Sequence, residues 1–539
     1  MPLDCGRRGI ELGPGVAIDA DQQQGPSLRA RAALAAILTI GFYSLAISLG
    51  VALIAGPFLI RMAGGPFNIW VALAMIGAGV TIFRALIPER ENFEPPGPEL
   101  TAQGQPELHG LLAQVAESAG EPMPGSVYFD PTLNAAVTEV SAGLGHGRRR
   151  VMLIGLPLLS ILNPDELRAV IAHEFGHYVG GDTRFGTWIW RTRSAIFKTI
   201  ASLNKEDSLF QRVIVRGPFL LYGRLFLRIT NAVSRRQEFA ADSLSARLTS
   251  PEAAGSALRR ITACAPAFDA YWREDVAPAL QRGHRPPVAQ GFQLFVGVKH
   301  IEAQLEELVS LDIQQAETNP YDSHPTLAER LRALGVEQTG AVEAPGNPAV
   351  TLARSVDEIE SGMLVASFGA EARKLTRIEW DEVGRLRRQD ADELAAQLKE
   401  VLGDVRLADL GALAADLSTR RDGIRAVADP ERRGTDEQLD GYQLYALSAL
   451  SAGALARSGW QLAALPGEPV KVTDGESELV PGELLRLIAV GEAKASDWEA
   501  RIRELGVAEL MLIPDARLVA PPPAAATASG SRAGTAADG

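Results

Sequence analysis

The chain has 539 residues, of which 46% are hydrophobic and 22% are charged, a balance typical of folded proteins with two or three domains. Its net charge of −13 argues against nucleic acid as the principal partner. The only two cysteines, Cys5 and Cys264, lie on opposite sides of the apolar segments described next, so no disulfide framework is expected and a reducing compartment is compatible.

Two uncharged apolar runs near the N-terminus predict a transmembrane helical hairpin. Residues 32–60 and 67–83 contain no charged side chain, and the first run is longer than the ~20 residues that a spanning helix needs. A cleaved signal peptide fits poorly, because the first run is too long and a second run follows it. We expect a flexible cytoplasmic N-terminus over 1–28 and two transmembrane helices within 29–90, with buried core helices as the alternative.

The arginines that flank these runs predict the orientation. The first run is preceded by Arg7, Arg8, Arg29 and Arg31, and the second is followed by Arg84 and Arg90. The turn between the two runs carries only Arg61. Positive charge is retained on the cytoplasmic side. We therefore expect a multi-pass protein of the cell (inner or plasma) membrane whose following domain is cytoplasmic.

Residues 173–177 read His-Glu-Phe-Gly-His, an H-E-x-x-H motif. On a helix, His173 and His177 share one face and can hold a single Zn²⁺, while Glu174 beside them can act as a general base. The alternative is a buried helix whose two histidines satisfy each other.

The flanking sequence predicts that helix. Asn163 suits the cap, Pro164 the first position, and Glu166 completes a capping box, while Gly180-Gly181 offers a left-handed stop. Apolar residues between these signals provide a surface for burial. The motif is therefore expected on a packed, rigid element.

A catalytic zinc site usually has three protein ligands, so a third must follow downstream. Position 183 is Thr, where the metzincin motif has a third His, so a carboxylate ligand is expected. Between His177 and residue 245 the acidic candidates are Asp182, Glu206, Asp207, Glu238 and Asp242.

Glu238 and Asp242 are the pair that helical periodicity stacks on one face, and the small residues Ala240 and Ala241 beside them allow another helix to approach closely. We expect Glu238 to bind the metal and Asp242 to accept the free ring N–H of a ligating histidine. A solvated, charged helix face is the alternative.

At this point the chain resembles a known family. H-E-F-G-H followed by R-R-Q-E-F-A-A-D is similar to the HtpX and CAAX prenyl endopeptidase family of integral-membrane zinc metallopeptidases, gluzincins whose third ligand is the Glu of an E-x-x-x-D helix. Asn134-Ala135 before a probable strand from Arg150 is similar to the family's Asn-Ala element, and His324-Pro325 through Arg330 to its later His-Pro-x-x-x-x-Arg motif. The resemblance covers roughly residues 95–335.

The later motif also has its own physical interpretation. His324 can donate to the oxyanion that forms during hydrolysis, and Arg330 can pair with a carboxylate or hold the preceding loop. The alternative is purely structural, because Pro325 and the Thr326–Glu329 capping box are also typical of an ordinary helix start. The resemblance favours the functional interpretation.

Substrate peptides of such enzymes can add to an exposed strand edge. Residues 148–154 are the candidate edge, with a fully buried strand as the alternative, and the resemblance adds Asn134 and Ala135 as neighbours of the substrate.

Residues 213–233 form a third apolar region, but Arg216, Arg224 and Arg228 make a lipid-exposed span expensive. We expect an amphipathic helix that lies on the membrane surface or packs on the domain. A buried globular helix is the alternative.

Beyond a Gly- and Pro-rich linker at 340–348, residues 350–515 have helical spacing with a strand-rich insert near 466–479. This accessory domain can recruit substrates, restrain the protease, form oligomeric contacts or act as a scaffold. The low-complexity segment 516–539 is expected to be disordered.

Together these features predict an α+β, mainly helical protein: a transmembrane hairpin, a zincin-like metallopeptidase domain with a small edge sheet at 95–338, and a helical C-terminal domain. The expected function is a zinc endopeptidase, with one Zn²⁺ per chain, that cleaves membrane or misfolded polypeptides in protein quality control at the bilayer. A CAAX-type prenyl-protein processing protease and a non-catalytic, metal-stabilised membrane adaptor are the alternatives.

Overall fold

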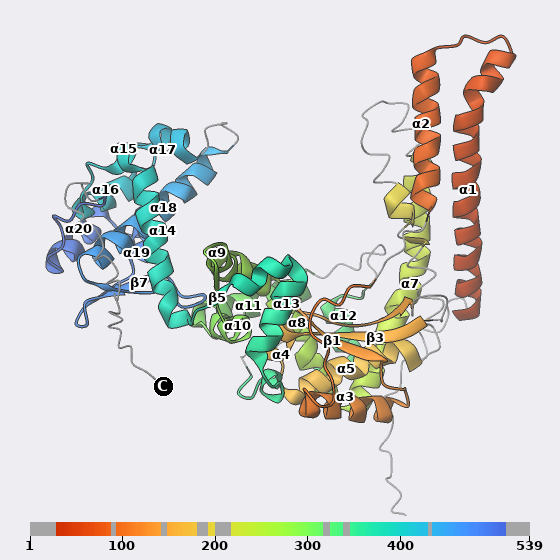
Figure 1. Ribbon diagram of the computed structural model, residues 1–539, viewed down its shortest axis with the longest axis horizontal. Coiled ribbons are helices and arrows are strands. Elements are labelled where there is room, and N and C mark those ends of the chain that lie inside the picture. Colours follow the sequence, from red (N-terminus) through yellow and green to blue (C-terminus); the bar gives the residue numbers. More distant parts are fainter. Residues whose placement is uncertain are drawn as a thin grey trace, which may run out of the picture.

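The computed structural model describes residues 28–87, 93–141, 148–179, 192–193, 195–199, 217–315, 324–337, 345–428 and 434–513. In this part of the chain helices predominate and the strands form small sheets. Figure 1 shows three regions in chain order: a helical hairpin, a central domain with the first sheet, and a helical lobe at the far end. The predictions for the flexible N-terminus, the Gly180-Gly181 stop, Asp182, Glu206, Asp207 and the tail from 516 fall outside the described residues.

The hairpin consists of α1 (Leu28–Met62) and α2 (Ile69–Leu86), and both helices are long and apolar enough to cross a membrane. The two helices pack closely, because Gly79 lies where a Cβ would be 2.9 Å from the Gly50 carbonyl oxygen. The outer surface is apolar, and none of the described residues covers it: Ile40 is 66% exposed and Trp70 76%. An exposed apolar surface of this kind requires lipid or a partner.

A third long helix, α7 (Gly217–Leu248), packs its first half along α1 (Figure 1). Phe219 and Phe226 are fully buried there, in a cluster with Phe42 of α1 and Ile82 of α2. Arg224 and Arg228 point outward and are exposed. Of the region 213–233, expected as an amphipathic helix on the membrane surface or on the domain, residues 217–233 form the start of one continuous helix that packs on the hairpin, and residues 213–216 lie outside the described residues.

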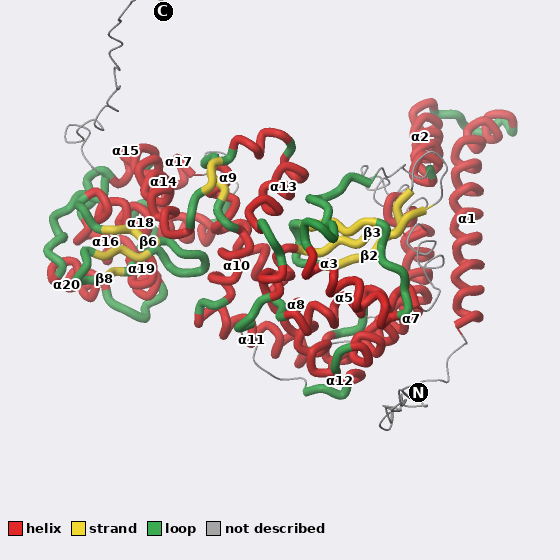
Figure 2. The backbone as a smooth tube through the Cα atoms, turned by 60° about the horizontal axis from the view of Figure 1, so that its bottom comes forward, coloured by secondary structure: helices red, strands yellow, loops and turns green. Residues whose placement is uncertain are grey.

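The central domain begins with a three-stranded sheet whose strand order is β1-β3-β2. Its elements are α3 (Pro106–Ala119), β1 (Ser126–Asp130), β2 (Ala135–Ser141), β3 (Arg148–Gly155), α4 (Leu156–Ile161) and α5 (Pro164–Val179). β3 pairs with β1 in parallel and with β2 in antiparallel orientation. Helices α3 and α5 lie along one face of the sheet (Figures 1 and 2), and a shared hydrophobic core joins them to it.

The prediction that residues 148–154 form the edge is wrong, since β3 is the central strand. Val151, Met152 and Ile154 are almost fully buried, as expected for a continuous apolar run that is covered on both sides. Among the strands that the structure describes, β2 occupies the edge next to α5.

The helices that complete the central domain surround a core around Tyr271, Phe292 and Leu331. They are α8 (Pro251–Tyr271), α9 (Ala277–Gln281), α10 (Val288–Val296), α11 (Lys299–Gln314) and α12 (Leu327–Leu334), with the short strand β4 (His284–Arg285).

Residues 349–383 also pack on this domain, although the predicted linker at 340–348 precedes them. They include α13 (Val356–Phe368) and β5 (Thr376–Arg377), which pairs with β4. Arg285 holds Asp357 by two hydrogen bonds of 2.6 and 3.0 Å, and Trp380 belongs to the central core. The described part of the predicted linker, residues 345–348, has no helix or strand, and the change from one core to the other comes later in the chain.

The far lobe has its own core around the fully buried Trp498, Leu450 and Leu455. Its helices are α14 (Val383–Gln397), α15 (Lys399–Leu402), α16 (Leu410–Ala415), α17 (Arg421–Ala428), α18 (Asp436–Arg457), α19 (Pro481–Ala489) and α20 (Ala495–Glu504). The lobe also has a small sheet of β6 (Gln461–Ala463), β7 (Lys471–Thr473) and β8 (Glu478–Leu479); β7 and β8 lie within the predicted strand-rich insert near 466–479, and β6 precedes it.

Candidate metal centre

The H-E-x-x-H motif lies on α5, which begins with the expected capping box. The side chain of Asn163 accepts the N–H groups of Asp165 and Glu166, each at 2.9 Å, and Glu166 accepts the Asn163 N–H at 2.8 Å. Glu166 is almost fully buried and also accepts a 2.6 Å hydrogen bond from Ser256 of α8. The capping residue therefore anchors the motif helix to the domain as well.

Helix α5 crosses α7 at unusually close range. A Cβ on Gly176 would lie 2.7 Å from the Cα of Ala241, and Ser245 of α7 donates a 2.6 Å hydrogen bond to the carbonyl of Ala169. Ala241 is fully buried at this contact, as the sequence predicts, whereas Ala240 is exposed and takes no part in it. This contact brings the downstream carboxylates to the two histidines.

Replacing Gly176 with Ala is expected to separate α5 from α7, because the added methyl group would overlap the backbone of Ala241. We expect a stability loss of about 1–3 kcal/mol, as for other overpacked sites, together with weaker metal binding. Gly110→Ala in α3 is the matched control, since nothing lies within 4 Å of its Cβ position and alanine favours a helix. Urea unfolding and metal titration of the two purified variants measure the difference; equal behaviour would refute this account of the contact.

His173, His177 and Glu238 converge at one point. Their ligand atoms all lie within 4.8 Å of one another. Nε2 of His173 is 3.6 Å from one carboxylate oxygen of Glu238, and Nε2 of His177 is 3.8 Å from the other. Two ligands of a tetrahedral Zn²⁺ are ~3.3 Å apart when each is ~2.0–2.1 Å from the ion. The set of two imidazoles and one carboxylate therefore fits zinc in both chemistry and spacing.

Asp242 and Arg330 support these ligands from behind. Nδ1 of His173 lies 2.9 Å from Asp242, which leaves Nε2 for the metal. Arg330 of α12 donates two hydrogen bonds to Asp242, at 2.8 and 2.6 Å, and its guanidinium lies 3.6 Å from Glu238. The structure thus places Arg330 on a carboxylate, one of its two expected positions.

The charges in the cluster shift its pKa values strongly. Burial disfavours the charge on Glu238, but hydrogen bonds with His173 and His324 and the charge of Arg330 outweigh burial and hold its pKa well below the usual range. Burial also lowers the pKa of His173, yet its bonds to Asp242 and Glu238 raise it to about 9. Burial lowers the pKa of His177 to about 4. A bound cation would favour the neutral ring at both histidines.

Glu174 lies between the two histidines and faces the edge strand. Burial raises its pKa to about 7, opposed by the charge of His173 and by a hydrogen bond from the Val137 backbone in β2. The Tyr178 hydroxyl donates to the Val137 carbonyl at 2.8 Å, and the Arg150 guanidinium lies over the Tyr178 ring at 4.4 Å. These contacts fix α5 against β2, and Val137, Tyr178 and Arg150 are site neighbours that the sequence patterns do not single out.

His324 lies at the entrance of the site. Its side chain is 68% exposed, and Nδ1 lies 3.1 Å from Glu238. The residue therefore reaches the cluster from the segment before α12, in a position from which a ring N–H can meet a substrate.

All nine residues expected to form the site line a single cleft of about 370 Å³. They are Asn134, Ala135, His173, Glu174, His177, Glu238, Asp242, His324 and Arg330. Leu258 and Ile261 of α8 add an apolar wall. No motif marks that wall, because its residues look like any buried face of a helix.

Comparison with known proteins agrees with this geometry. Residues 102–338 match peptidase family M48. The chain is 27% identical over 251 residues to a protein named Protease HtpX homolog of Persephonella marina, a match that covers 44% of this chain and 76% of that protein. It is 29% identical over 247 residues to Protease HtpX of Idiomarina loihiensis, with 43% and 72% covered. It is 31% identical over 177 residues to Protease HtpX of Klebsiella pneumoniae, with 29% and 58% covered. No solved structure matches the chain significantly.

The site and these matches define a metalloprotease domain. Residues 102–338 are similar to peptidase family M48 and to proteins named Protease HtpX, which confirms the family resemblance. The two apolar helices and the HtpX relatives together indicate a membrane protease.

Proposed function

We propose that the chain is a membrane-anchored zinc endopeptidase that hydrolyses peptide bonds of membrane or misfolded proteins at the cytoplasmic face of the membrane, as in protein quality control. The observation that carries this proposal is the convergence of His173, His177 and Glu238 beside Glu174 in one open cleft. A purely structural metal site has no use for a general base.

One Zn²⁺ per chain would be held by His173, His177 and Glu238. When bound, it would polarise the scissile carbonyl and lower the pKa of water to about 7. Glu174 then takes a proton from the attacking water and returns it to the leaving amine. His324 would donate a hydrogen bond to the substrate oxygen that gains charge, while Asp242 and Arg330 would hold the ring of His173 and the carboxylate of Glu238 in position.

The polypeptide substrate is proposed to lie extended beside the start of β2. Asn134 and Ala135 line the cleft at this point, and β2 is an edge strand among the described residues. Pairing through main-chain groups gives affinity with little sequence preference, which suits an enzyme for varied substrates.

The short distance between the apolar hairpin and the metal ligands supports membrane or misfolded polypeptides as substrates. Phe226, which packs on the hairpin, and Glu238 lie on the same continuous helix, about 18 Å apart along its axis at 1.5 Å per residue. A polypeptide that emerges from or approaches the membrane surface can therefore reach the cleft.

Casein cleavage by the full chain in detergent tests the proposal. We expect one zinc per purified chain, loss of cleavage after treatment with a strong chelator, and recovery on addition of Zn²⁺ but not Mg²⁺, which is a poor match for imidazole ligands. Cleavage that survives complete removal of zinc would contradict the proposal. Preference for a prenylated peptide over casein would favour the CAAX-type alternative, which shares the same zinc chemistry.

The proposed orientation makes a separate prediction. A single cysteine in place of Gly64, in the turn between α1 and α2, should react with a membrane-impermeant maleimide added to intact cells. A cysteine in place of the exposed Asp165 of α5 should react only after the membrane is opened. Both variants also carry Cys5→Ser, which removes one of the two natural cysteines. The other, Cys264, is buried and therefore protected from the reagent. The reverse labelling pattern would place the peptidase domain outside the cytoplasm.

A further inference from the structure

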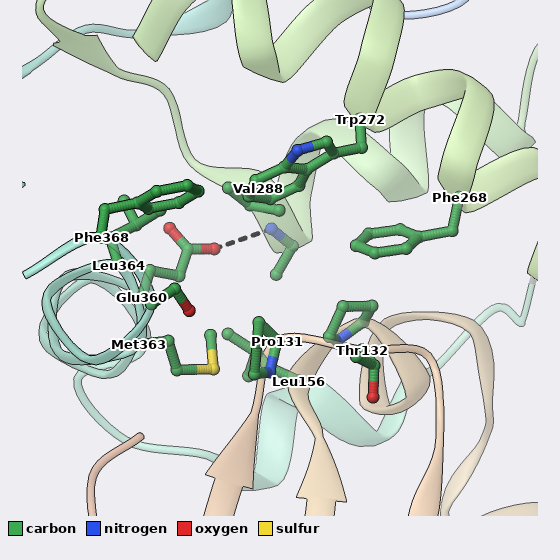
Figure 3. Close-up of a pocket in the computed structure, with 13 residues that line it drawn as sticks. Pro131, Thr132, Leu156, Phe268, Trp272, Val288, Glu360, Met363, Leu364 and Phe368 are labelled. Atoms are coloured by element: carbon green, nitrogen blue, oxygen red, sulfur yellow. Dashed lines mark hydrogen bonds between the residues drawn. The ribbon is translucent and has the colours of Figure 1, made fainter. Parts of the chain in front are cut away.

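A second cavity of about 210 Å³ lies in the central domain and shares no lining residue with the metal cleft. It is lined by the loop after β1, the start of α4, the end of α8 with Trp272 directly after it, the start of α10, and α13 (Figure 3). Its walls are largely aromatic and aliphatic, with the following main contributors: Pro131, Leu156, Phe268, Trp272, Met363 and Phe368.

One carboxylate interrupts this apolar lining. Glu360 is 1% exposed, and one of its oxygens accepts the Ala289 N–H at 2.7 Å. Its other oxygen, Oε2, is buried and has no hydrogen-bond partner. Figure 3 shows the carboxylate beside Phe368 and Val288, below the ring of Trp272. A buried carboxylate oxygen without a partner is costly and rare in folded proteins.

Among the described residues, no cationic side chain donates a hydrogen bond to Glu360. The nearby Arg285 is held by two hydrogen bonds to Asp357, which also pairs with Arg377. The remaining polar side chains of the lining are hydroxyls, Thr132 and Ser367, and Thr132 already donates to Asp130. Burial raises the pKa of Glu360 to about 7, although the backbone N–H groups of Ala289 and Val288 and the charge of Arg285 oppose this rise.

The lining and the volume together specify a ligand. A carboxylate between aromatic rings is an environment that binds ammonium groups, because the carboxylate supplies the counter-charge and ring faces attract cations. A cavity of ~150 Å³ lined by apolar side chains holds one benzene molecule, so this larger cavity has room for a ring with a short arm. An acid would be repelled by Glu360, and a hydrocarbon would leave Oε2 unpaired.

We propose that this cavity is a binding site for a small primary amine that carries one aromatic or similar apolar group. Its ammonium group donates to Oε2 of Glu360, and its ring packs between Phe268, Trp272 and Met363. The site is separate from the metal cleft, so this inference does not rest on the proposed peptidase function.

Isothermal titration of the full-length protein in detergent with 2-phenylethylamine tests the inference. We expect saturable binding at one site per chain, and weaker binding of 2-phenylethanol, which has the same shape without the charge. Glu360→Gln is expected to weaken amine binding at least about tenfold, the factor for one lost hydrogen bond to a charged group. Gln keeps an acceptor for the Ala289 N–H, and an unchanged melting temperature would verify that the variant folds.

Glu358→Gln is the matched control, since Glu358 is an exposed residue of the same helix. It should bind the amine as wild type does. The inference is overturned if the amine does not bind, if the alcohol binds equally well, or if Glu360→Gln leaves the affinity unchanged. The titration is repeated on Glu174→Gln, where the same amine affinity is expected, so failure of the peptidase proposal and failure of this one give different results.

Discussion

Replacing Glu174 with Gln is expected to lower the rate of casein cleavage by about 10²–10⁴-fold, the contribution typical of a general acid–base group. The substitution removes the proton acceptor but leaves His173, His177 and Glu238, whose ligand atoms define the metal site. Bound zinc should therefore stay at the wild-type level. Initial rates and zinc content measured on one preparation separate a chemical defect from loss of the metal.

The control for this variant is Asp165→Asn, an acid-to-amide change on the same helix. The Asp165 side chain is 76% exposed and lies in the first turn of α5, away from the cleft. Its cleavage rate should equal that of the wild type. Full activity of Glu174→Gln would exclude Glu174 as the base, and a wild-type protein that binds zinc without cleaving any substrate would favour the adaptor alternative.

Replacing Arg330 with Leu is expected to cause the largest loss of stability among the site variants. Arg330 donates two hydrogen bonds to Asp242, whose side chain is 4% exposed, and it also lies near Glu238. Removing one partner of a buried ion pair leaves the other uncompensated and costs about 3–5 kcal/mol. Since Asp242 orients His173, zinc affinity should also fall, by about 10–100-fold. Urea unfolding and competition with a chromophoric zinc chelator measure the two effects.

Arg332→Leu is the matched control, because Arg332 is exposed on the same helix. It should change the free energy of unfolding by less than about 0.5 kcal/mol. Arg330→Lys should fall between the two, since lysine keeps the charge but not the planar pair of donors. If Arg330→Leu behaves like Arg332→Leu, the ion pair does not support the site.

The features predicted well from the sequence depend on local signals. The uncharged runs at 32–60 and 67–83 coincide with α1 and α2, because length and hydropathy alone specify such helices. Asn163 and Glu166 form the capping box that their spacing predicts. The two histidines of α5 share a face because four residues make about one helical turn.

The features that were missed depend on contacts between distant segments. Nothing near Gly176 in the sequence indicates that Ala241 lies against it, although this contact fixes the distance between the metal-binding helices. An apolar strand has the same sequence pattern whether it is central or at an edge, so the pattern of β3 does not indicate that β2 is the edge strand beside it. Likewise, composition placed a linker before Ala349, whereas the pairing of Arg285 with Asp357 keeps the following segment on the central domain.

The central claim is that two histidines and one glutamate hold a catalytic zinc ion. X-ray absorption spectroscopy at the zinc edge of the purified full-length protein tests it most directly. We expect one zinc per chain with two imidazole nitrogens at about 2.0–2.1 Å, a carboxylate oxygen at about 2.0–2.2 Å and no sulfur. In Glu238→Ala we expect loss of the oxygen ligand or of the metal. A sulfur ligand, or an unchanged spectrum and zinc content in Glu238→Ala, would contradict the account.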